Sequence, residues 1–234
     1  MGPLAARRGL DVNVRSGPQA REYEAIVERI RRDAPRSILD WGCGFGQVTQ
    51  LMRRAGLDVT AFDYRPGPGT DGPQPLQRYP DLRVHLSSDP VALPFADASF
   101  EAVLSCGVLE HVLHPDASLE EIKRVLAPGG TFYVFKLPNR YSYLEHLARG
   151  MGLYYHGAEP LDAVYTRRSA RALLRRHGFQ VKEVQLANML PLTLPGRPAA
   201  RAAGAIWAAN RILGRVPGLN LLATNLELVA TPRP

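Results

Sequence analysis

Hydrophobic positions along the chain follow two spacings, and the two alternate. Nearly continuous apolar segments predict short buried strands over residues 37–41, 59–62, 82–86, 100–105 and 131–135. Apolar residues at helical spacing predict amphipathic helices over 19–32, 46–56 and 118–126. Strands that alternate with helices predict an α/β fold, in which a parallel sheet carries helices on both faces.

After Lys136 this alternation is looser. The pattern predicts a helix over 166–177 that ends before Gly178, a strand over 179–186, a helix over 199–215 and a last strand over 222–229. Two segments fall outside it, an aromatic-rich one at 137–166 and a second at 187–220 that begins Pro-rich. With no internal repeat or low-complexity linker, we expect residues 1–234 to form a single domain with insertions at about 137–166 and 187–220.

The composition of the 234 residues is that of an ordinary globular protein, with 45% hydrophobic and 22% charged residues. This balance excludes a disordered, collagen-like or coiled-coil chain. No apolar run is long enough for a membrane span, and the N-terminus lacks the apolar core of a secretory signal. The two cysteines, Cys43 and Cys106, cannot form a disulfide framework, so we expect a reducing, cytoplasmic location.

The net charge of +7 is unevenly distributed. Residues 37–136 carry eight basic and twelve acidic groups, whereas residues 137–234 carry thirteen basic and five acidic ones. A basic region can meet nucleic acid, anionic lipid or an acidic small molecule. The simpler interpretation is a solvated surface in an arginine-rich chain, because 26 of the 29 basic residues are arginine.

A glycine-rich turn follows the first predicted strand, in Ile38-Leu39-Asp40-Trp41-Gly42-Cys43-Gly44-Phe45-Gly46. Glycines let the backbone approach a ligand, and the next helix presents free N–H groups. A phosphate-binding P-loop requires a glycine and then a lysine where this chain has Gln47, with no lysine after it. A dinucleotide fingerprint requires Gly or Ala at the same position. Both are therefore rejected. The third nucleotide-type interpretation of such a loop is a site for S-adenosylmethionine (SAM).

The motif Asp40-x-Gly42-Cys43-Gly44-x-Gly46 resembles the first motif of class I SAM-dependent methyltransferases. Similar family segments follow in the expected order: Asp63 after the second strand, residues 89–95 with 98–101, residues 106–112 and residues 126–130. The resemblance covers residues 36–136 well and 164–230 weakly. It implies a Rossmann-like, seven-stranded, mostly parallel sheet with helices on both faces and an antiparallel last strand.

The resemblance also implies a site for SAM and its product, S-adenosylhomocysteine. Asp40 would face the methionyl ammonium group, Asp63 the ribose hydroxyls and Asp89 the adenine amine. Pro90 departs from the family pattern, because it has no N–H for the adenine ring. The expected cofactor-binding residues are Asp40, Gly42, Cys43, Gly44, Gly46, Asp63, Tyr64, Asp89 and Cys106.

Each of these residues also has a purely structural interpretation. The glycines could make only a tight turn, Asp63 could cap the end of a strand, and Asp89 could form a loop Asx-turn. We interpret Cys43 and Cys106 as buried thiols, since Ser105-Cys106-Gly107 is not the motif of a nucleophilic cysteine in 5-methylcytosine enzymes.

Methyl transfer from a sulfonium is an in-line displacement, so the enzyme mainly aligns the reactants and excludes water. A hydroxyl acceptor usually also needs a base. His156 and His111 are the candidate bases, with His146 as a third, and each could instead be a packed or surface imidazole. Asn139, Tyr141 and Tyr143 follow the fifth strand and are the expected acceptor pocket, or else ordinary loop packing.

The predicted helix over 199–215 gathers Ala202, Ile206, Ala209 and Leu213 on one face and Arg201, Arg211 and Arg215 on another. Such a helix could lie on an anionic membrane, or it could be a packed lid or a dimer helix. We therefore expect a monomer or homodimer, with peripheral membrane contact as an open alternative.

The predicted function is SAM-dependent methyl transfer to a small-molecule, glycan or lipid-linked acceptor, with oxygen as the expected atom. It resembles the ubiquinone-type and secondary-metabolite branch of the family. An RNA methyltransferase is a weaker alternative, since Ser105-Cys106-Gly107-Val108 is not the exocyclic-amine motif and no RNA-binding module is visible. A non-catalytic SAM-fold binding protein is the other alternative. No metal is expected, because no ligand set has useful spacing.

Overall fold

The computed structural model describes residues 17–65, 79, 81–152, 162–192 and 197–233. Its centre is a single seven-stranded sheet with the strand order β3-β2-β1-β4-β5-β7-β6. The strands are β1 Ile38–Trp41, β2 Val59–Tyr64, β3 Val84–Ser87, β4 Phe100–Cys106, β5 Leu126–Pro138, β6 Phe179–Ala187 and β7 Asn225–Pro232.

The helices in chain order are α2 Gly17–Asp33, α3 Gln47–Arg54, α4 Pro115–Val125, α5 Tyr143–Gly150, α6 Arg167–Arg176, α7 Arg197–Arg201 and α8 Ala203–Leu213. Short 3-10 helices lie at η2 Leu109–His111 and η3 Leu219–Leu222. No helix among the described residues is long and apolar enough to cross a membrane.

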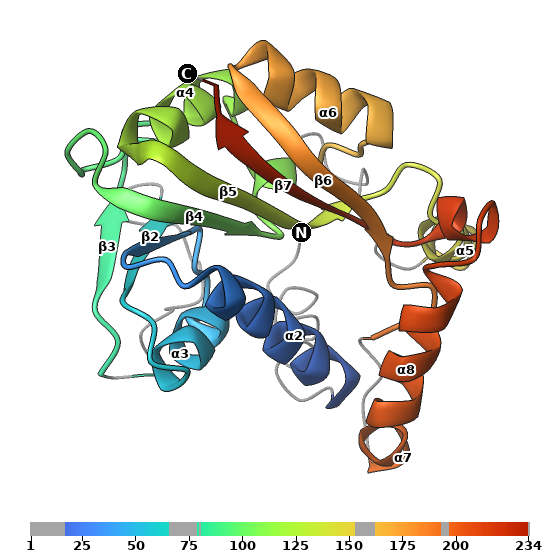
Figure 1. The fold of residues 1–234 in the computed structure, drawn as a ribbon. Helices are drawn as coiled ribbons and strands as arrows, with labels where there is room; N and C mark the ends of the chain where they lie inside the picture. The colour runs from blue at the N-terminus through green and yellow to red at the C-terminus, as the bar shows by residue number, and fades with distance from the viewer. Residues whose placement is uncertain (1–16, 66–78, 80, 153–161, 193–196, 234) are drawn as a thin grey trace.

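Strands β1 to β5 pair in parallel, whereas β7 is antiparallel to both of its neighbours, β5 and β6. The expected seven-stranded, mostly parallel sheet with an antiparallel last strand is therefore confirmed. The last strand is inserted between β5 and β6, so it lies inside the sheet (Figure 1).

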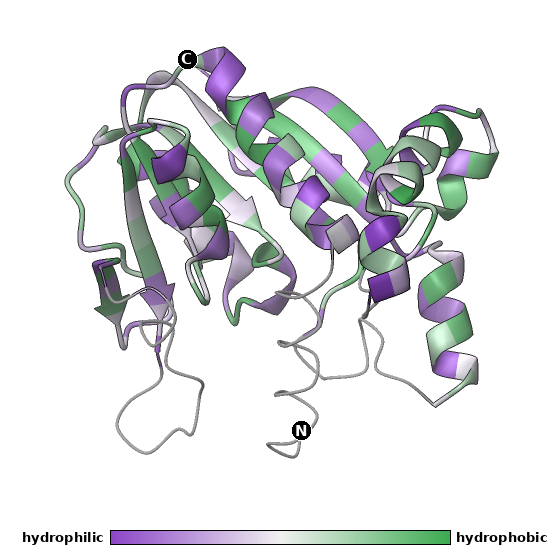
Figure 2. Cartoon of the chain, turned by 90° about the horizontal axis from the view of Figure 1, so that it is seen from below, coloured by the Kyte–Doolittle hydropathy of each residue, from purple (hydrophilic) through white to green (hydrophobic). Residues whose placement is uncertain are grey.

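Two hydrophobic layers cover the sheet, one on each face. Successive strand residues point to opposite faces, so Ile38 packs against α2 and α3, whereas Leu39 belongs to the layer under α4 and α6. In Figure 1, α2 and α3 lie below the sheet and α4 and α6 above it. Figure 2 shows hydrophobic residues along the strands and polar residues recurring along the helices, which is the pattern that predicted the fold.

Three elements differ from the sequence-based expectation. Helix α4 begins at Pro115, whose fixed φ suits the first helical position, so Ser118 is a buried residue within the helix and not its first residue. Helix α5 was not predicted, although Ser142 caps it by accepting a hydrogen bond from the Glu145 N–H at 3.2 Å. The helix expected over 199–215 is two shorter helices, α7 and α8, which meet at Ala202.

Helices α7 and α8 pack beside the N-terminal half of α2. A Cβ atom on Gly17, at the start of α2, would lie 3.0 Å from the Ala200 Cα atom in α7. The segment between β6 and β7 therefore joins α2 on the lower face of the sheet, as Figure 1 shows.

Candidate active site

The carboxyl ends of β1, β2, β3 and β4 lie at one edge of the sheet. Trp41 is opposite Ser105 of β4, and Tyr64 is opposite Ser87 of β3. The glycine loop, Asp63, Asp89 and Cys106 follow or end these strands, so the fold brings the predicted cofactor residues to one place. Ligands of open α/β sheets bind at such an edge.

The glycine loop holds three residues in the left-handed region, with φ angles of 75° at Gly42, 56° at Gly44 and 75° at Gly46. A Cβ atom on Gly42 would lie 2.5 Å from the Val108 side chain, and one on Gly46 would lie 2.2 Å from Leu82. At Gly44, by contrast, a Cβ atom would meet no atom of the described residues within 4 Å. Gly42 and Gly46 therefore permit close packing, whereas the Gly44 backbone faces open space that a ligand can fill.

Asp40 is a buried carboxylate on β1, beneath the start of α3. It accepts a hydrogen bond from the Thr49 hydroxyl. The pKa of Asp40 is raised to about 6, mainly by burial and also by the nearby Asp63, while hydrogen bonds from Thr49 oppose the shift. A cationic group bound here would favour the ionised form of Asp40.

Asp63 lies near the end of β2, where its carboxylate accepts the Tyr64 N–H at 2.9 Å and the Gly44 N–H. Burial raises the pKa of Asp63, although these hydrogen bonds counter it. The Tyr64 side chain itself is exposed. Asp63 therefore stabilises the glycine loop and is also available to hydroxyl donors.

Asp89 lies on the loop after β3 and is exposed. One of its oxygens accepts the N–H groups of Val91 and Ala92, both at 2.8 Å. These bonds lower the pKa of Asp89, with the Ala92 N–H as the larger cause. Asp89 therefore forms the Asx-type turn that was the structural alternative to a binding role. Its position at the strand ends is also suitable for contact with adenine.

Cys43 and Cys106 are both free thiols, and Cys43 is buried. Burial raises the pKa of both thiols well above their ordinary value, so neither is poised as a thiolate nucleophile. This agrees with their interpretation as packed thiols beside the cofactor loop.

A buried ion pair lies next to Cys106, and sequence analysis missed it. Lys136 donates from Nζ to Glu22 of α2 at 2.7 Å, and the Asn188 and Gln19 side-chain amides also donate to Glu22. Burial alone would lower the pKa of Lys136, but Glu22 and Tyr23 raise it above its ordinary value. Lys136 is therefore held as a cation.

The backbone is strained at two of these residues. Lys136 has φ 61° and Asn188 has φ 68°, and neither is a glycine. Lys136 lies in an irregular part of β5, where the register with β7 shifts between Val134 and Leu137. Bulges commonly redirect a side chain near a functional site, and such residues cost about 1–3 kcal/mol each. Both strained residues direct a side-chain nitrogen to Glu22.

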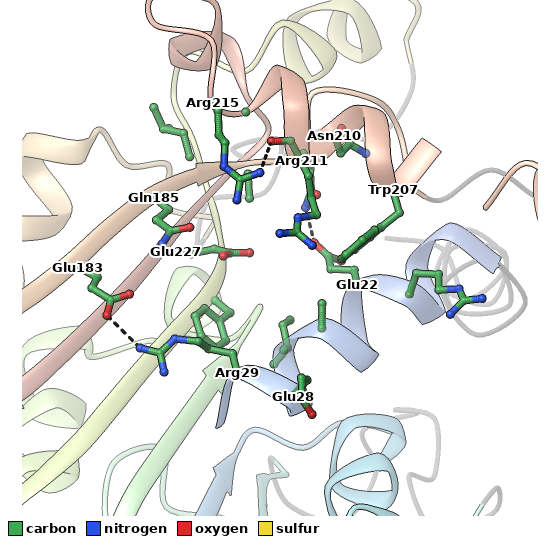
Figure 3. A pocket seen from close by; sticks show the side chains of 18 of the residues that line it. Glu22, Glu28, Arg29, Glu183, Gln185, Trp207, Asn210, Arg211, Arg215 and Glu227 are labelled. Carbon is green, nitrogen blue, oxygen red and sulfur yellow. Dashed lines mark hydrogen bonds and ion pairs between the residues drawn. The ribbon is translucent and has the colours of Figure 1, made fainter. Parts of the chain in front are cut away.

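A cavity of about 1060 Å³ lies between α2, α8 and the β6–β7 face of the sheet (Figure 3). Glu227 of β7 projects into it, between Glu22 and Arg29 of α2. Arg29 closes one side through an ion pair with Glu183 at 3.0 Å. Trp207 of α8 lines another side, with Arg211 stacked on its ring at 4.8 Å.

The predicted catalytic histidines are only partly described. His156 lies outside the described residues. His111 ends η2 after β4, and its Nδ1 atom is 2.8 Å from the buried Asp162 carboxylate. A carboxylate in this position fixes the orientation of an imidazole. His111 lies beside the α4–α6 layer, to which its neighbours Leu109 and Val112 belong.

The three predicted acceptor-pocket residues support loops. The Asn139 amide donates to the carbonyls of Leu221 and Ala223 at 2.8 and 2.7 Å. The Tyr143 hydroxyl donates to the Met189 carbonyl, whereas Tyr141 is 55% exposed. None of the three is among the described residues that line the cavity. They connect the segments after β5 and β6.

Of Glu22, Lys136 and Glu227, only the last two carried a signal in the sequence, and it was weak. Lys136 interrupts an apolar strand, between Phe135 and Leu137, and Glu227 does the same between Leu226 and Leu228. A lone charge in a buried strand can mark a site. Glu22 carried no such signal, because a glutamate in an amphipathic helix is ordinary.

Comparison with known proteins identifies the family. The model of the family described as "Methyltransferase domain" matches residues 39–134. The demethylmenaquinone methyltransferase of Renibacterium salmoninarum is 32% identical over 164 residues, which are 67% of this chain and 68% of that protein. The chain belongs to the class I SAM-dependent methyltransferases.

Two further matches agree. An uncharacterized methyltransferase of Mycobacteroides abscessus is 31% identical over 215 residues, which are 85% of this chain and 77% of that protein. The fold matches the 1,6-didemethyltoxoflavin-N1-methyltransferase of Burkholderia thailandensis, solved with S-adenosylhomocysteine, with a TM-score of 0.58. That structure is 21% identical, and the match covers 97% of this chain and 84% of that one.

The residues at the strand ends fit SAM, the cofactor of this methyltransferase. Two carboxylates with raised pKa values, the buried Asp40 and the half-buried Asp63, suit an ammonium group and a ribose diol, which would supply the missing charge and donors. The open space at Gly44 admits a ligand against the backbone. Among the described residues, no group of three or more His, Cys, Asp or Glu side chains could hold a metal ion.

Proposed function

We propose that this methyltransferase transfers the SAM methyl group to an oxygen atom of a small-molecule acceptor. The observation that carries the proposal is the adjacency of two sites. The carboxylates of Asp40 and Asp63 suit SAM, and the cavity beneath α8 offers room for an acceptor. The two are connected through Cys106, which interacts electrostatically with Asp40 on one side and with Lys136 and Glu22 on the other.

Each cofactor residue has a proposed task. Asp40 binds the methionyl ammonium, Asp63 accepts from the ribose hydroxyls, and Asp89 accepts from the adenine amine. Backbone at Gly42 and Gly44 gives close contact, with Cys43, Gly46, Tyr64 and Cys106 around it. When bound, SAM supplies a methyl group on a sulfonium, and the electron pair of the broken C–S bond stays on sulfur.

The segments 137–166 and 187–220 are proposed to shape the acceptor site of a single domain. An acceptor hydroxyl must also lose its proton. His111, oriented by Asp162, and His156 are the candidate bases from the sequence, with His146 of α5 as a third. His111→Ala tests the first of them: a loss of turnover with unchanged SAM binding would identify it as the base, and retained turnover would exclude it.

Methylation at a ring carbon is a second candidate. Relatives from Renibacterium salmoninarum and Thermus thermophilus are named demethylmenaquinone methyltransferases, that is, after a demethylated quinone. The position of the new methyl group in the product, read by NMR, separates carbon from oxygen methylation.

Peripheral contact with an anionic membrane is a further part of the proposal. Ile212, Val216, Leu219, Leu221 and Leu222 are all exposed, although they are large and hydrophobic. The stretch 188–226 contains four arginines and no acidic residue. Exposed apolar side chains among arginines suit an anionic lipid surface.

Flotation with vesicles that contain phosphatidylserine tests this contact. We expect binding that falls as the salt rises from about 0.05 to 0.5 M, because electrostatic attraction is screened. The double change Leu221→Asp/Leu222→Asp should abolish flotation, whereas Leu147→Asp on α5 should preserve it. Equal flotation with uncharged vesicles would contradict the role of the arginines.

Calorimetric titration of SAM tests the function itself. We expect micromolar binding, and Asp63→Ala should weaken it by at least about tenfold, or about 1.4 kcal/mol. Glu101→Gln is the matched control, since that carboxylate pairs with Arg36 on the surface at the opposite end of β4. Folded protein that does not bind SAM would overturn the proposal.

A further inference from the structure

The cavity between α2 and α8 combines apolar walls with a polar floor. Ile26, Phe135, Leu186, Val229 and the ring of Trp207 form the walls. Glu227, Gln185 and Asn188 supply polar groups on the sheet face. This lining is that of a small-molecule site, in which a few polar groups orient an otherwise apolar ligand. Trp207 adds a flat surface for an aromatic ring.

Glu227 is the acidic group placed on the sheet floor of this cavity, where it is opposite Gln185 of β6. The pKa of Glu227 is raised to about 7, mainly by burial and also by the nearby Glu22 carboxylate, while Lys136 opposes the shift. Arg29 and Glu183 face the cavity from α2 and β6, and Arg211 and Arg215 face it from α8. A carboxyl group that titrates near neutrality can both accept and release a proton under working conditions.

The ion pair of Lys136 and Glu22 connects the cavity with the strand ends that carry the cofactor residues. Lys136 and Cys106 interact electrostatically, and Cys106 ends β4 beside Phe135, a wall residue. The strained backbone at Lys136 and Asn188 keeps both side chains on Glu22. The polar end of the cavity is thus built from four segments that are far apart in sequence: α2, the end of β4, β5 and the residues after β6.

We propose that this cavity is the acceptor site of the methyltransferase, that it takes an aromatic compound carrying a hydroxyl group, and that Glu227 accepts the hydroxyl proton. The inference rests on the proposed function and names its substrate class. In the proton transfer the O–H bond breaks, its electron pair stays on the acceptor oxygen, and the proton binds a Glu227 carboxylate oxygen. His111 does not line the cavity, so Glu227 takes the role expected of the histidines.

The test uses the full chain saturated with S-adenosylhomocysteine, which prevents turnover. The probes are 1-naphthol and 1-methoxynaphthalene, which share the ring system but differ in the hydroxyl proton. Calorimetry at about pH 8 should give at least about tenfold tighter binding of 1-naphthol, because a charged acceptor strengthens the hydrogen bond. Glu227→Gln should reduce this preference to threefold or less.

Each test variant has a matched control: a second carboxylate for Glu227→Gln and a second glycine for Gly204→Leu. Glu101→Gln changes a surface carboxylate that pairs with Arg36 and is not among the described residues that line the cavity, so the preference should remain. A Cβ atom on Gly204 of α8 would meet no described residue within 4 Å, so Gly204→Leu should fill the cavity and weaken both probes at least tenfold. Gly150→Leu on α5, where a Cβ atom is equally clear of the described part of the chain, should leave binding unchanged.

A ¹³C NMR titration of glutamate side chains measures the pKa of Glu227 with and without each probe. This pKa would not respond to the probe's hydroxyl group if Glu227 had only a structural role. Donation from a bound hydroxyl stabilises the carboxylate, so 1-naphthol should lower the pKa of Glu227, whereas 1-methoxynaphthalene should not. Glu227→Gln identifies the resonance by its loss.

The inference is overturned if the wild type binds neither probe, shows no preference, or keeps its preference in Glu227→Gln. The same preparations are titrated with SAM. Intact SAM binding alongside a failed probe test would reject the acceptor site alone, whereas loss of SAM binding in the wild type would reject the proposed function.

Discussion

The two halves of the sheet position their functional residues through different kinds of contact, local in one half and long-range in the other. The cofactor half, β1 to β4, relies on local backbone geometry, so that Asp40 and its partner Thr49 are nine residues apart. The half that we propose to bind the acceptor, β5 to β7 (the acceptor half), relies on pairs between distant segments. Lys136 is 114 residues from Glu22, and Asn188 is 166 residues from it. A shared ligand can be held by a compact motif, whereas a specific pocket here depends on contacts that form only in the folded chain.

The largest expected effect is the loss of the Glu22 charge. Glu22→Gln leaves the buried Lys136 cation without its partner, since the two side chains are only 6% and 20% exposed. Breaking a buried pair typically costs about 3 kcal/mol, which urea unfolding would measure. Glu24→Gln is the control, because its pair with Arg21 is exposed and its loss should be within error. Equal losses of unfolding free energy in both variants would contradict the comparison, because the acceptor half would then not depend on its buried ion pair.

The next largest effect is expected in the glycine loop, where one glycine is needed for packing and another for binding. Gly42→Ala would place a Cβ atom 2.5 Å from Val108 and should cost about 2–3 kcal/mol of stability. Gly44→Ala has open space and should cost only about 1 kcal/mol for its left-handed backbone.

The same pair of variants should behave differently toward the cofactor. We expect the folded Gly44→Ala variant to bind SAM at least about tenfold more weakly, because its methyl group occupies the space beside the backbone. Calorimetry alongside unfolding would measure both properties. Unchanged SAM affinity in Gly44→Ala would show that the open space is not the cofactor site.

The smallest effect is the pH dependence that Asp40 confers. Its pKa is raised from 3.8 to about 6 in the folded protein, so the folded state holds this proton more tightly than the unfolded state. Its contribution to stability therefore falls as the pH rises from about 3.8 to about 6. SAM affinity should change in the opposite direction, rising up to about tenfold through this range, because the ammonium group pairs with the ionised carboxylate.

Asp40→Asn provides the control for this pH dependence. The variant should lose both trends, which urea unfolding and calorimetry at several pH values would reveal. If Asp40→Asn retained the wild-type pH dependence of SAM binding, another group would be responsible.

The sequence predicted the cofactor half more completely than the acceptor half, and particular residues show why. Gly42, Gly44 and Gly46 have φ angles that disfavour other residues, so their identities report the backbone directly. Helix α5 was missed although Ser142 and Glu145 have capping-box spacing, because the aromatic residues of this segment suggested a loop. The break at Ala202 had no local signal, since its composition is helical throughout.

The sequence by itself determined the sheet, the order of its elements and the chemistry of the cofactor loop, because hydrophobic spacing and glycine geometry act over a few neighbouring residues. Only the tertiary structure decided that Glu22 and Glu227 line one cavity, that Lys136 pairs with Glu22 beside it, and that Asn139 supports a loop. Burial changes the chemistry of a side chain, and burial is a property of the packed chain. The raised pKa of Glu227 is therefore a consequence of the fold and not of the sequence around it.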